Sequence, residues 1–166
     1  SSVVGVFEKI VSQLTIIMCF QSLILDMAGN VGTQSLAVTI RVLMDESLTG
    51  KQKVELVFKE MKIALSNGTI LGILSFLVLG LYIALFKGKT WAFAYAVSGC
   101  IGLSLTLAMV ISGAVGTLIP LFFKKINVDP AVASGPLITT VNDLVAVVTY
   151  YGLCGILLIG VLHLAG

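Results

Sequence analysis

Long apolar stretches separated by short polar segments are the main pattern of the chain. Four stretches are long enough to cross a bilayer as helices: 11–43, 63–86, 91–123 and 131–165. A hydrocarbon core of about 30 Å needs about 20 apolar residues in a helix, and the second and third stretches contain no charged side chain. The pattern predicts an all-α integral membrane protein with four full spans. Residues 1–7 are apolar but too short to cross, and we expect them to end a fifth, truncated span.

Stretch 11–43 is longer than a bilayer requires, since a straight helix of that length would measure about 50 Å. Gly29, Asn30 and Gly32 lie in its middle. Either the helix continues beyond the bilayer, or it is interrupted at 28–32. An interruption at membrane depth requires protein or a water-filled cavity around the exposed backbone.

The composition also indicates a membrane protein. Of the 166 residues, 58% are hydrophobic and 11% are charged, whereas soluble domains carry about 25% charged residues. These few charges exclude a free-standing soluble domain, and the net charge of +2 argues against a nucleic acid partner. Cys19, Cys100 and Cys154 lie singly in apolar stretches without the spacing of metal ligands, so we expect them to pack as small apolar side chains.

Most charged residues lie in the connections between the spans. Seven basic residues lie in or beside connections 44–62 and 124–130, against three on the opposite side. Because cytoplasmic loops carry the excess of Lys and Arg, we predict that both connections are cytoplasmic in a multi-pass plasma-membrane protein. Thr49 and Gln52 have the spacing of a capping box. We therefore expect 49–62 to form a short amphipathic helix on the membrane surface, or alternatively a docking site for another domain. The charged side chains expected on its exposed side are Lys51, Lys53, Glu55, Lys59 and Glu60.

Two carboxylates lie within the predicted spans, Asp26 in the first and Asp143 in the last. An aspartate at the centre of a lone membrane helix costs about 2.5–3.5 kcal/mol, and the basic residues lie toward the ends of the spans. Each carboxylate must therefore be neutral, hydrated or paired with a cation from outside the chain.

The polar neighbours of these carboxylates favour a bound cation. Helical spacing places two amides on the face of Asp26, and a threonine lies one turn before Asp143. These side chains offer oxygen atoms without imidazole or thiolate, which suits a hard cation such as Mg²⁺ or Ca²⁺. The candidate residues of this metal site are Asp26, Asn30, Gln34, Thr139, Asn142 and Asp143.

Asp143 alone is a poor site for a divalent cation, which proteins usually hold with one or two carboxylates and several waters. Two copies around a two-fold axis bring two such carboxylates to one hydrated ion, so we predict a homodimer with a pore at or near that axis. Three alternatives remain open: a protonated aspartate bonded to another helix, a structural scaffold, and an intramembrane protease that uses the two aspartates as acid and base. Nothing else in the sequence favours an enzyme, and we predict neither catalytic nor cofactor-binding residues.

Two motifs resemble those of the MgtE family of magnesium transport proteins. Residues 27–35 (MAGNVGTQS) are similar to the family's Gly-Asn-x-Gly-x-Gln signature, and 129–143 are similar to its last-span signature. The resemblance extends over essentially the whole chain and implies one transmembrane transport domain, 1–166, with the last four of the family's five spans. It also implies a homodimer that passes Mg²⁺ between its subunits. Many members have regulatory cytoplasmic domains, and we expect any such domain to lie outside this chain.

The resemblance also implies roles for single residues. Asp143 matches the pore carboxylate that holds a largely hydrated Mg²⁺, and Thr139 matches a residue whose carbonyl faces the ion. We expect Thr139 and Asn142 to orient the waters of the ion, and Asn30 and Gln34 to line the facing wall.

The chain departs from the family pattern at Asp26, where the family has a glycine. We therefore expect Asp26 to add a second cation site, or a coupling site for Na⁺ or H⁺. A Na⁺-coupled Mg²⁺ exchanger is thus the alternative to a channel-like pore, since a helix interrupted at 29–32 would be a feature that transporters share.

Overall fold

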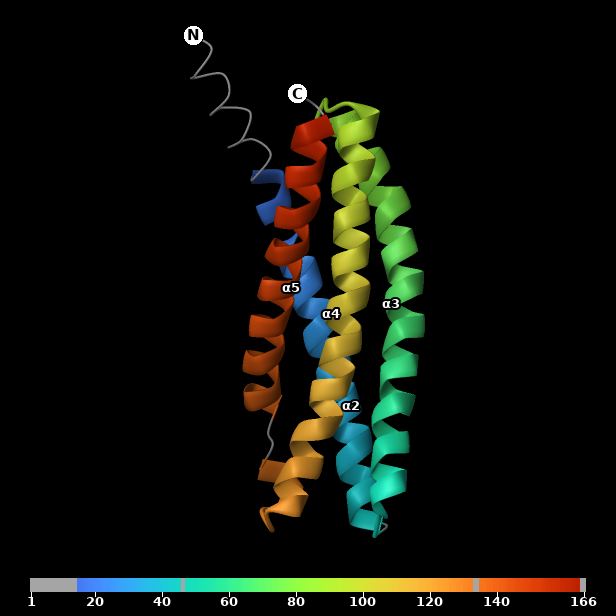
Figure 1. The fold of residues 1–166 in the computed structure, drawn as a ribbon, viewed down its shortest axis with the longest axis vertical. Coiled ribbons are helices and arrows are strands. Elements are labelled where there is room, and N and C mark those ends of the chain that lie inside the picture. The colour runs from blue at the N-terminus through green and yellow to red at the C-terminus, as the bar shows by residue number, and fades with distance from the viewer. Residues whose placement is uncertain (1–14, 46, 133–134, 165–166) are drawn as a thin grey trace.

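Helix α4 (Trp91–Lys125) lies at the centre of the structure and packs against every other helix (Figure 1). The computed structural model describes residues 15–45, 47–132 and 135–164, with side chains to 157. The elements that surround α4 are α2 (Gln21–Asp45), α3 (Gly50–Phe86), the short 3₁₀ helix η1 (Pro130–Val132) and α5 (Gly135–Leu164).

Four helices are long and apolar enough to cross a membrane, which confirms the predicted all-α architecture with four spans. The outer face of α3 is apolar yet exposed, with Ile73, Leu77 and Leu81 about half exposed, as expected for a surface that meets lipid. The expected fifth, truncated span at 1–7 lies outside the described residues.

Small residues allow α3 and α4 to approach closely. A Cβ atom added to Gly72 would lie 2.8 Å from the Gly102 carbonyl oxygen, so the two backbones are in direct contact. Thr106 Oγ1 donates across the same interface to the Gly68 carbonyl at 2.8 Å. Lipid tails are as apolar as the helices, so close packing and interhelical hydrogen bonds hold membrane helices together.

Helices α2, α4 and α5 meet at Gly32. A Cβ atom at Gly116 of α4 would overlap the Gly32 carbonyl, and a Cβ atom at Gly32 would overlap the side-chain amide of Asn142 on α5. The three helices can therefore meet here because Gly32 has no side chain to hold them apart.

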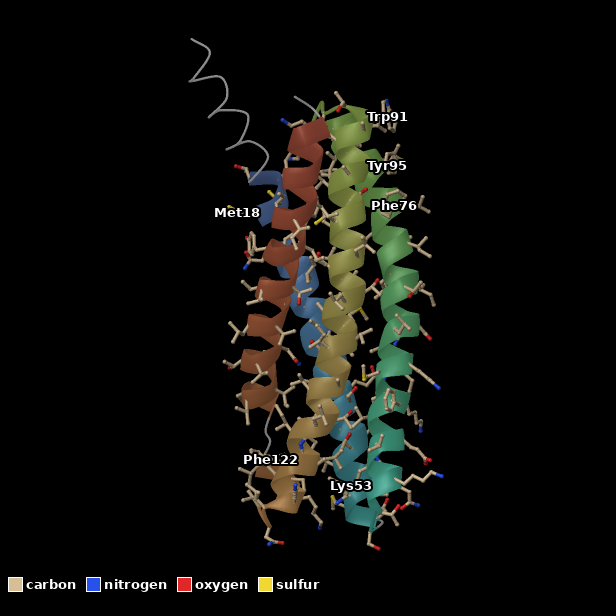
Figure 2. All side chains as sticks on the ribbon, in the orientation of Figure 1. Met18, Lys53, Phe76, Trp91, Tyr95 and Phe122 are labelled. Carbon is tan, nitrogen blue, oxygen red and sulfur yellow. The ribbon has the colours of Figure 1, made fainter. Side chains whose placement is uncertain are left out.

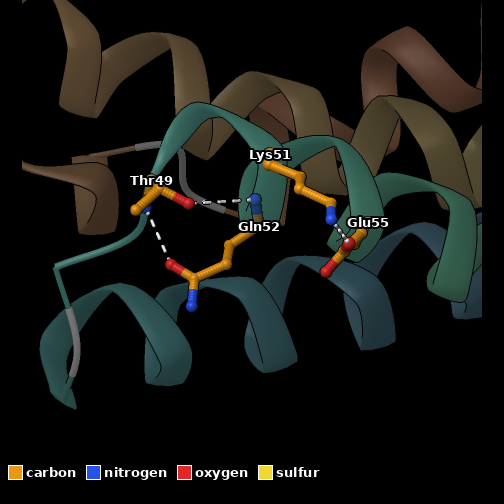
Figure 3. A network of polar contacts seen from close by, with 4 residues as sticks. All are labelled: Thr49, Lys51, Gln52 and Glu55. Carbon is orange, nitrogen blue, oxygen red and sulfur yellow. Dashed lines mark hydrogen bonds and ion pairs between the residues drawn. The ribbon is translucent and has the colours of Figure 1, made fainter.

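One expectation about helix boundaries is wrong. Segment 49–62 is not a separate surface helix, because α3 runs without a break from Gly50 to Phe86, and only a short connection separates it from α2. The capping box is confirmed: the Gln52 amide N–H donates to Thr49 Oγ1 at 3.3 Å, and the Thr49 amide N–H donates to Gln52 Oε1 at 2.9 Å (Figure 3). Of the two alternatives for stretch 11–43, the continuous helix is the one observed, because α2 runs without a break through 28–32. The regular helical pattern is broken instead at Phe20, just before α2 begins.

Glu60 was expected on the exposed side of that surface helix and is instead 97% buried, since its relative exposure is 3%. Ser35 Oγ of α2 donates to Glu60 Oε2 at 2.9 Å. The continuous helix explains the difference, because Glu60 follows Leu56 and precedes Ala64 at intervals of four on the packed face of α3.

Replacing Gly102 with Ala is expected to destabilise the bundle by about 1–3 kcal/mol, because the new methyl group overlaps the Gly72 backbone of α3. Denaturant unfolding in detergent, followed by circular dichroism, measures this loss. Gly99→Ala is the matched control one turn away in α4, where a Cβ atom would lie 3.6 Å from the Phe76 ring. Equal unfolding free energies for the two variants would contradict the close α3–α4 contact.

Candidate functional site

A groove of about 830 Å³ lies between α2 and α5 and brings together residues more than 100 positions apart in the sequence. Its polar lining comes mainly from α2, and α5 contributes a threonine and an aspartate. The polar residues that line it are Gln21, Ser22, Asp26, Asn30, Thr33, Thr139 and Asp143.

The helical repeat explains why these side chains share the groove. On α2, Ser22, Asp26 and Asn30 follow one another at intervals of four, so they lie on one face. Buried apolar residues such as Ile24 and Ala28 occupy the opposite face of α2 and pack into the core. The α2 face that lacks an apolar partner within the bundle therefore carries the oxygen-bearing side chains.

The six predicted site residues divide into three groups. Asp26, Asn30, Thr139 and Asp143 line the groove, and Asp143 is half-buried whereas the other three are exposed. Gln34 is exposed one turn beyond Asn30 and is not among the lining residues.

Asn142 alone forms the third group, because it lies away from the groove. It is fully buried against Gly32, and neither its Nδ2 nor its Oδ1 has a hydrogen-bond partner among the described residues. Adjacent residues on a helix point about 100° apart, so the contact of Asn142 with α2 leaves Asp143 facing the groove. Asn142 is therefore adjacent to the site in sequence and separate from it in space.

The groove contains two carboxylates and no compensating basic side chain from the described part of the chain. Among the described residues, neither Asp26 nor Asp143 has a basic nitrogen within 4.0 Å. The ion pair of the described residues, Lys51 with Glu55, lies at the beginning of α3, away from the groove. The single hydroxyl proton of Thr33 is shared between the Gly29 and Asn30 carbonyl oxygens, each 3.0 Å from Oγ1, which leaves the lone pairs of Oγ1 as acceptors. The lining also includes the apolar side chains of Met18, Leu25 and Met27. Its carboxylate, amide and hydroxyl oxygens, with no imidazole or thiolate, suit a hard cation.

Two hydrogen bonds from α5 hold the turn at Phe20, and no pattern in the sequence indicated them. The Ile17 carbonyl accepts a hydrogen bond from the Phe20 amide at 3.2 Å and another from the buried Tyr150 hydroxyl at 2.7 Å. The neighbouring Tyr151 hydroxyl donates to Oε1 of Gln21, a lining residue, at 2.6 Å. Two adjacent tyrosines of α5 thus hold the irregular turn of the first span. The run Tyr150-Tyr151 was visible in the sequence, but its partners lie about 130 residues earlier.

Comparisons with known proteins agree on one family. A family model described as MgtE, divalent cation transporter, matches residues 21–153. The chain is 35% identical over 152 residues to the magnesium transporter MgtE of Bacillus subtilis, covering 92% of this chain and 32% of that protein. The corresponding protein of Enterococcus faecalis is 34% identical, with the same coverage of both chains. That of Thermus thermophilus is 29% identical over 95% of this chain and 33% of its own length. The chain spans about a third of the length of these relatives.

Replacing Tyr150 with Phe is expected to lower the unfolding free energy by about 1 kcal/mol, because it removes one hydrogen bond to a buried carbonyl and leaves the ring in place. Tyr82→Phe is the matched control, since the Tyr82 ring is partly exposed and stacks on Phe86. Thermal unfolding of both variants in detergent checks the prediction, and an unchanged melting temperature for Tyr150→Phe would contradict a stabilising bond to Ile17.

Proposed function

Because the chain belongs to the MgtE family of divalent cation transporters, we propose that it carries Mg²⁺ across the membrane along the groove between α2 and α5. The observation that carries this proposal is the presence of Asp26 and Asp143 in one oxygen-lined groove without a basic partner among the described residues. Mg²⁺ gives up its waters reluctantly and is usually held by one or two carboxylates together with several waters. A wide, polar groove suits an ion in that hydrated state.

A second copy of the chain covers the groove. Asp26 is exposed on the outer surface of the bundle, within a helix long and apolar enough to span the membrane. An aspartate facing hydrocarbon costs several kcal/mol, and such residues face a bundle interior or a water path. A homodimer with its two-fold axis along the groove removes that cost and closes the groove into a channel-like pore. It also places two copies of Asp143 around one ion.

Asp143 is the electrostatic anchor of the hydrated ion in this proposal. It is half-buried on α5, and Thr139 lies one turn before it in the same groove. Asn30 stands on the facing wall, and Gln34 extends that wall once the second copy is present. Asn142 acts by packing on Gly32, which holds the rotation of α5, and not by contact with the waters of the ion.

A Na⁺-coupled Mg²⁺ exchanger is the second candidate, and the position of Asp26 favours it. Asp26 lies in the same groove as Asp143 and adds a second negative charge on the opposite helix. A monovalent cation at Asp26 would then compete with, or be coupled to, Mg²⁺ near Asp143. The continuous course of α2 through 28–32 removes the interrupted helix as an argument for this alternative.

Asp143→Asn is expected to abolish almost all Mg²⁺ uptake by proteoliposomes while the protein stays folded, because the substitution removes the charge and keeps the shape. Asp45→Asn is the matched control, since Asp45 is exposed at the end of α2, away from the groove. Ordinary uptake by a folded Asp143→Asn protein would overturn the assignment.

Asp26→Asn is expected to raise the Mg²⁺ concentration for half-maximal uptake by about tenfold, equivalent to about 1.4 kcal/mol of lost attraction. Uptake measured at several membrane voltages, with and without a Na⁺ gradient, separates the two candidate functions. A Na⁺ dependence that disappears in the variant supports the exchanger, whereas loss of affinity alone supports a second site in a pore. Unchanged affinity, voltage response and Na⁺ dependence would remove Asp26 from the mechanism.

A further inference from the structure

The first part of α3 extends beyond the membrane. A helix of 37 residues is about 55 Å long, against about 30 Å of hydrocarbon. The charge-free run of α3 begins at Ile63, so the residues from Gly50 to Lys62 lie at the headgroup level and beyond. Figure 2 places Lys53 at this end of the bundle, and Trp91 and Tyr95 at the other.

Folding leaves this part of α3 more positive on its surface than its sequence indicates. Both glutamates of this segment already have a partner. Glu60 is buried and accepts a hydrogen bond from Ser35 Oγ, and Glu55 Oε1 lies 3.8 Å from Lys51 Nζ (Figure 3). Lys59 and Lys62 are exposed and form no ion pair with any described residue. The outer face therefore carries uncompensated positive charge.

These two lysines border a shallow groove of about 450 Å³ that has an apolar side. Phe58 and Ile63 complete its lining together with Glu55, and Phe58 is 57% exposed. The groove faces away from the bundle, because Leu56, Glu60 and Ala64 are the buried residues of this part of α3. Two lysines, an exposed aromatic ring and the first residue of the apolar run thus lie next to one another on the outer face of α3.

We propose that this groove binds the headgroup of an anionic phospholipid, with its phosphate between Lys59 and Lys62, the Phe58 ring beside the headgroup and its upper acyl chain against Ile63. Basic residues next to a membrane span attract anionic lipids, and lysine stems lie along apolar surface while their ammonium groups reach the headgroups. Charge complementarity selects an anionic lipid over a zwitterionic one. The proposal does not depend on the transported ion.

A tryptophan at position 58 reports directly on the lipid beside the groove. The chain has one tryptophan, Trp91, so Phe58→Trp combined with Trp91→Phe leaves a single reporter. Its fluorescence is measured in vesicles of phosphatidylcholine mixed with brominated phosphatidylglycerol or brominated phosphatidylcholine. We expect preferential quenching by the anionic lipid, and a smaller preference at high salt because salt screens exposed charges.

Lys59→Gln and Lys62→Gln are each expected to reduce the preference for anionic over zwitterionic lipid about fivefold. This factor corresponds to the attraction of about 1 kcal/mol that one lysine contributes near an anionic surface. Lys53→Gln is the matched control, since it removes the same charge from the same helix but lies outside the groove. Circular dichroism confirms that each variant is folded, and glutamine keeps the helix propensity of lysine.

Three results would overturn the proposal. Equal quenching by both lipids would exclude selection of an anionic headgroup. An equal effect of Lys53→Gln and Lys59→Gln would indicate a general surface potential and no defined site. Quenching by neither lipid would show that no lipid lies beside position 58.

Discussion

The contact of three helices at Gly32 is the constraint on which the rest of the structure depends. The α4 backbone at Gly116 and the Asn142 side chain of α5 both occupy space that any side chain at position 32 would need. This contact sets how far α2 and α5 are rotated about their own axes. Once Gly32 faces α4 and α5, the face with Ser22, Asp26 and Asn30 turns outward to form one wall of the groove. The position of the acidic groove is thus a consequence of backbone packing.

The membrane explains why such contacts are needed. A bilayer supplies little hydrophobic driving force between helices, so close approach of small residues and interhelical hydrogen bonds contribute the stability. Helix α4 meets this requirement with glycines against both α3 and α2, and Thr106 adds a hydrogen bond to the Gly68 carbonyl. About two turns before Gly68 on α3, Glu60 receives a hydrogen bond from Ser35, so this buried carboxylate has a partner on α2. Thr106 and Glu60 thus each join two helices through a hydrogen bond, whereas the buried hydroxyls of Ser98 and Thr117 donate to carbonyls of their own helix.

The sequence predicted the spans well because their signal is local. Charge-free runs of about 20 residues and a capping box are each contained in one segment. The sequence left open whether the first stretch is interrupted at 28–32, and it gave no sign of the turn at Phe20, because the hydrogen bonds that hold that turn come from α5. Tyr150 and Tyr151 lie about 130 residues after the turn that they hold, so the sequence around the turn does not reveal them. Gly29 and Gly32 belong to a continuous helix, where Gly32 allows close packing.

The burial of Glu60 was predictable, and its signal is a spacing of four. Leu56, Glu60 and Ala64 continue into Gly68 and Gly72, and all five residues are buried on α3. A stripe with one carboxylate among small and apolar residues places that carboxylate on the packed face. The charge of the side chain hid this pattern, because a lysine-rich segment suggests an exposed helix.

Asn142 and Asp143 illustrate how far a pattern of polar residues can define a site. Both are polar and adjacent, and sequence alone gives no reason to separate them. The structure assigns the neutral amide to the helix contact at Gly32 and the carboxylate to the groove. Burying a neutral polar group without a partner costs far less than burying an isolated charge, so the opposite rotation of α5 would be strongly disfavoured. The absence of a side chain at Gly32 therefore selects which of the two residues reaches the groove.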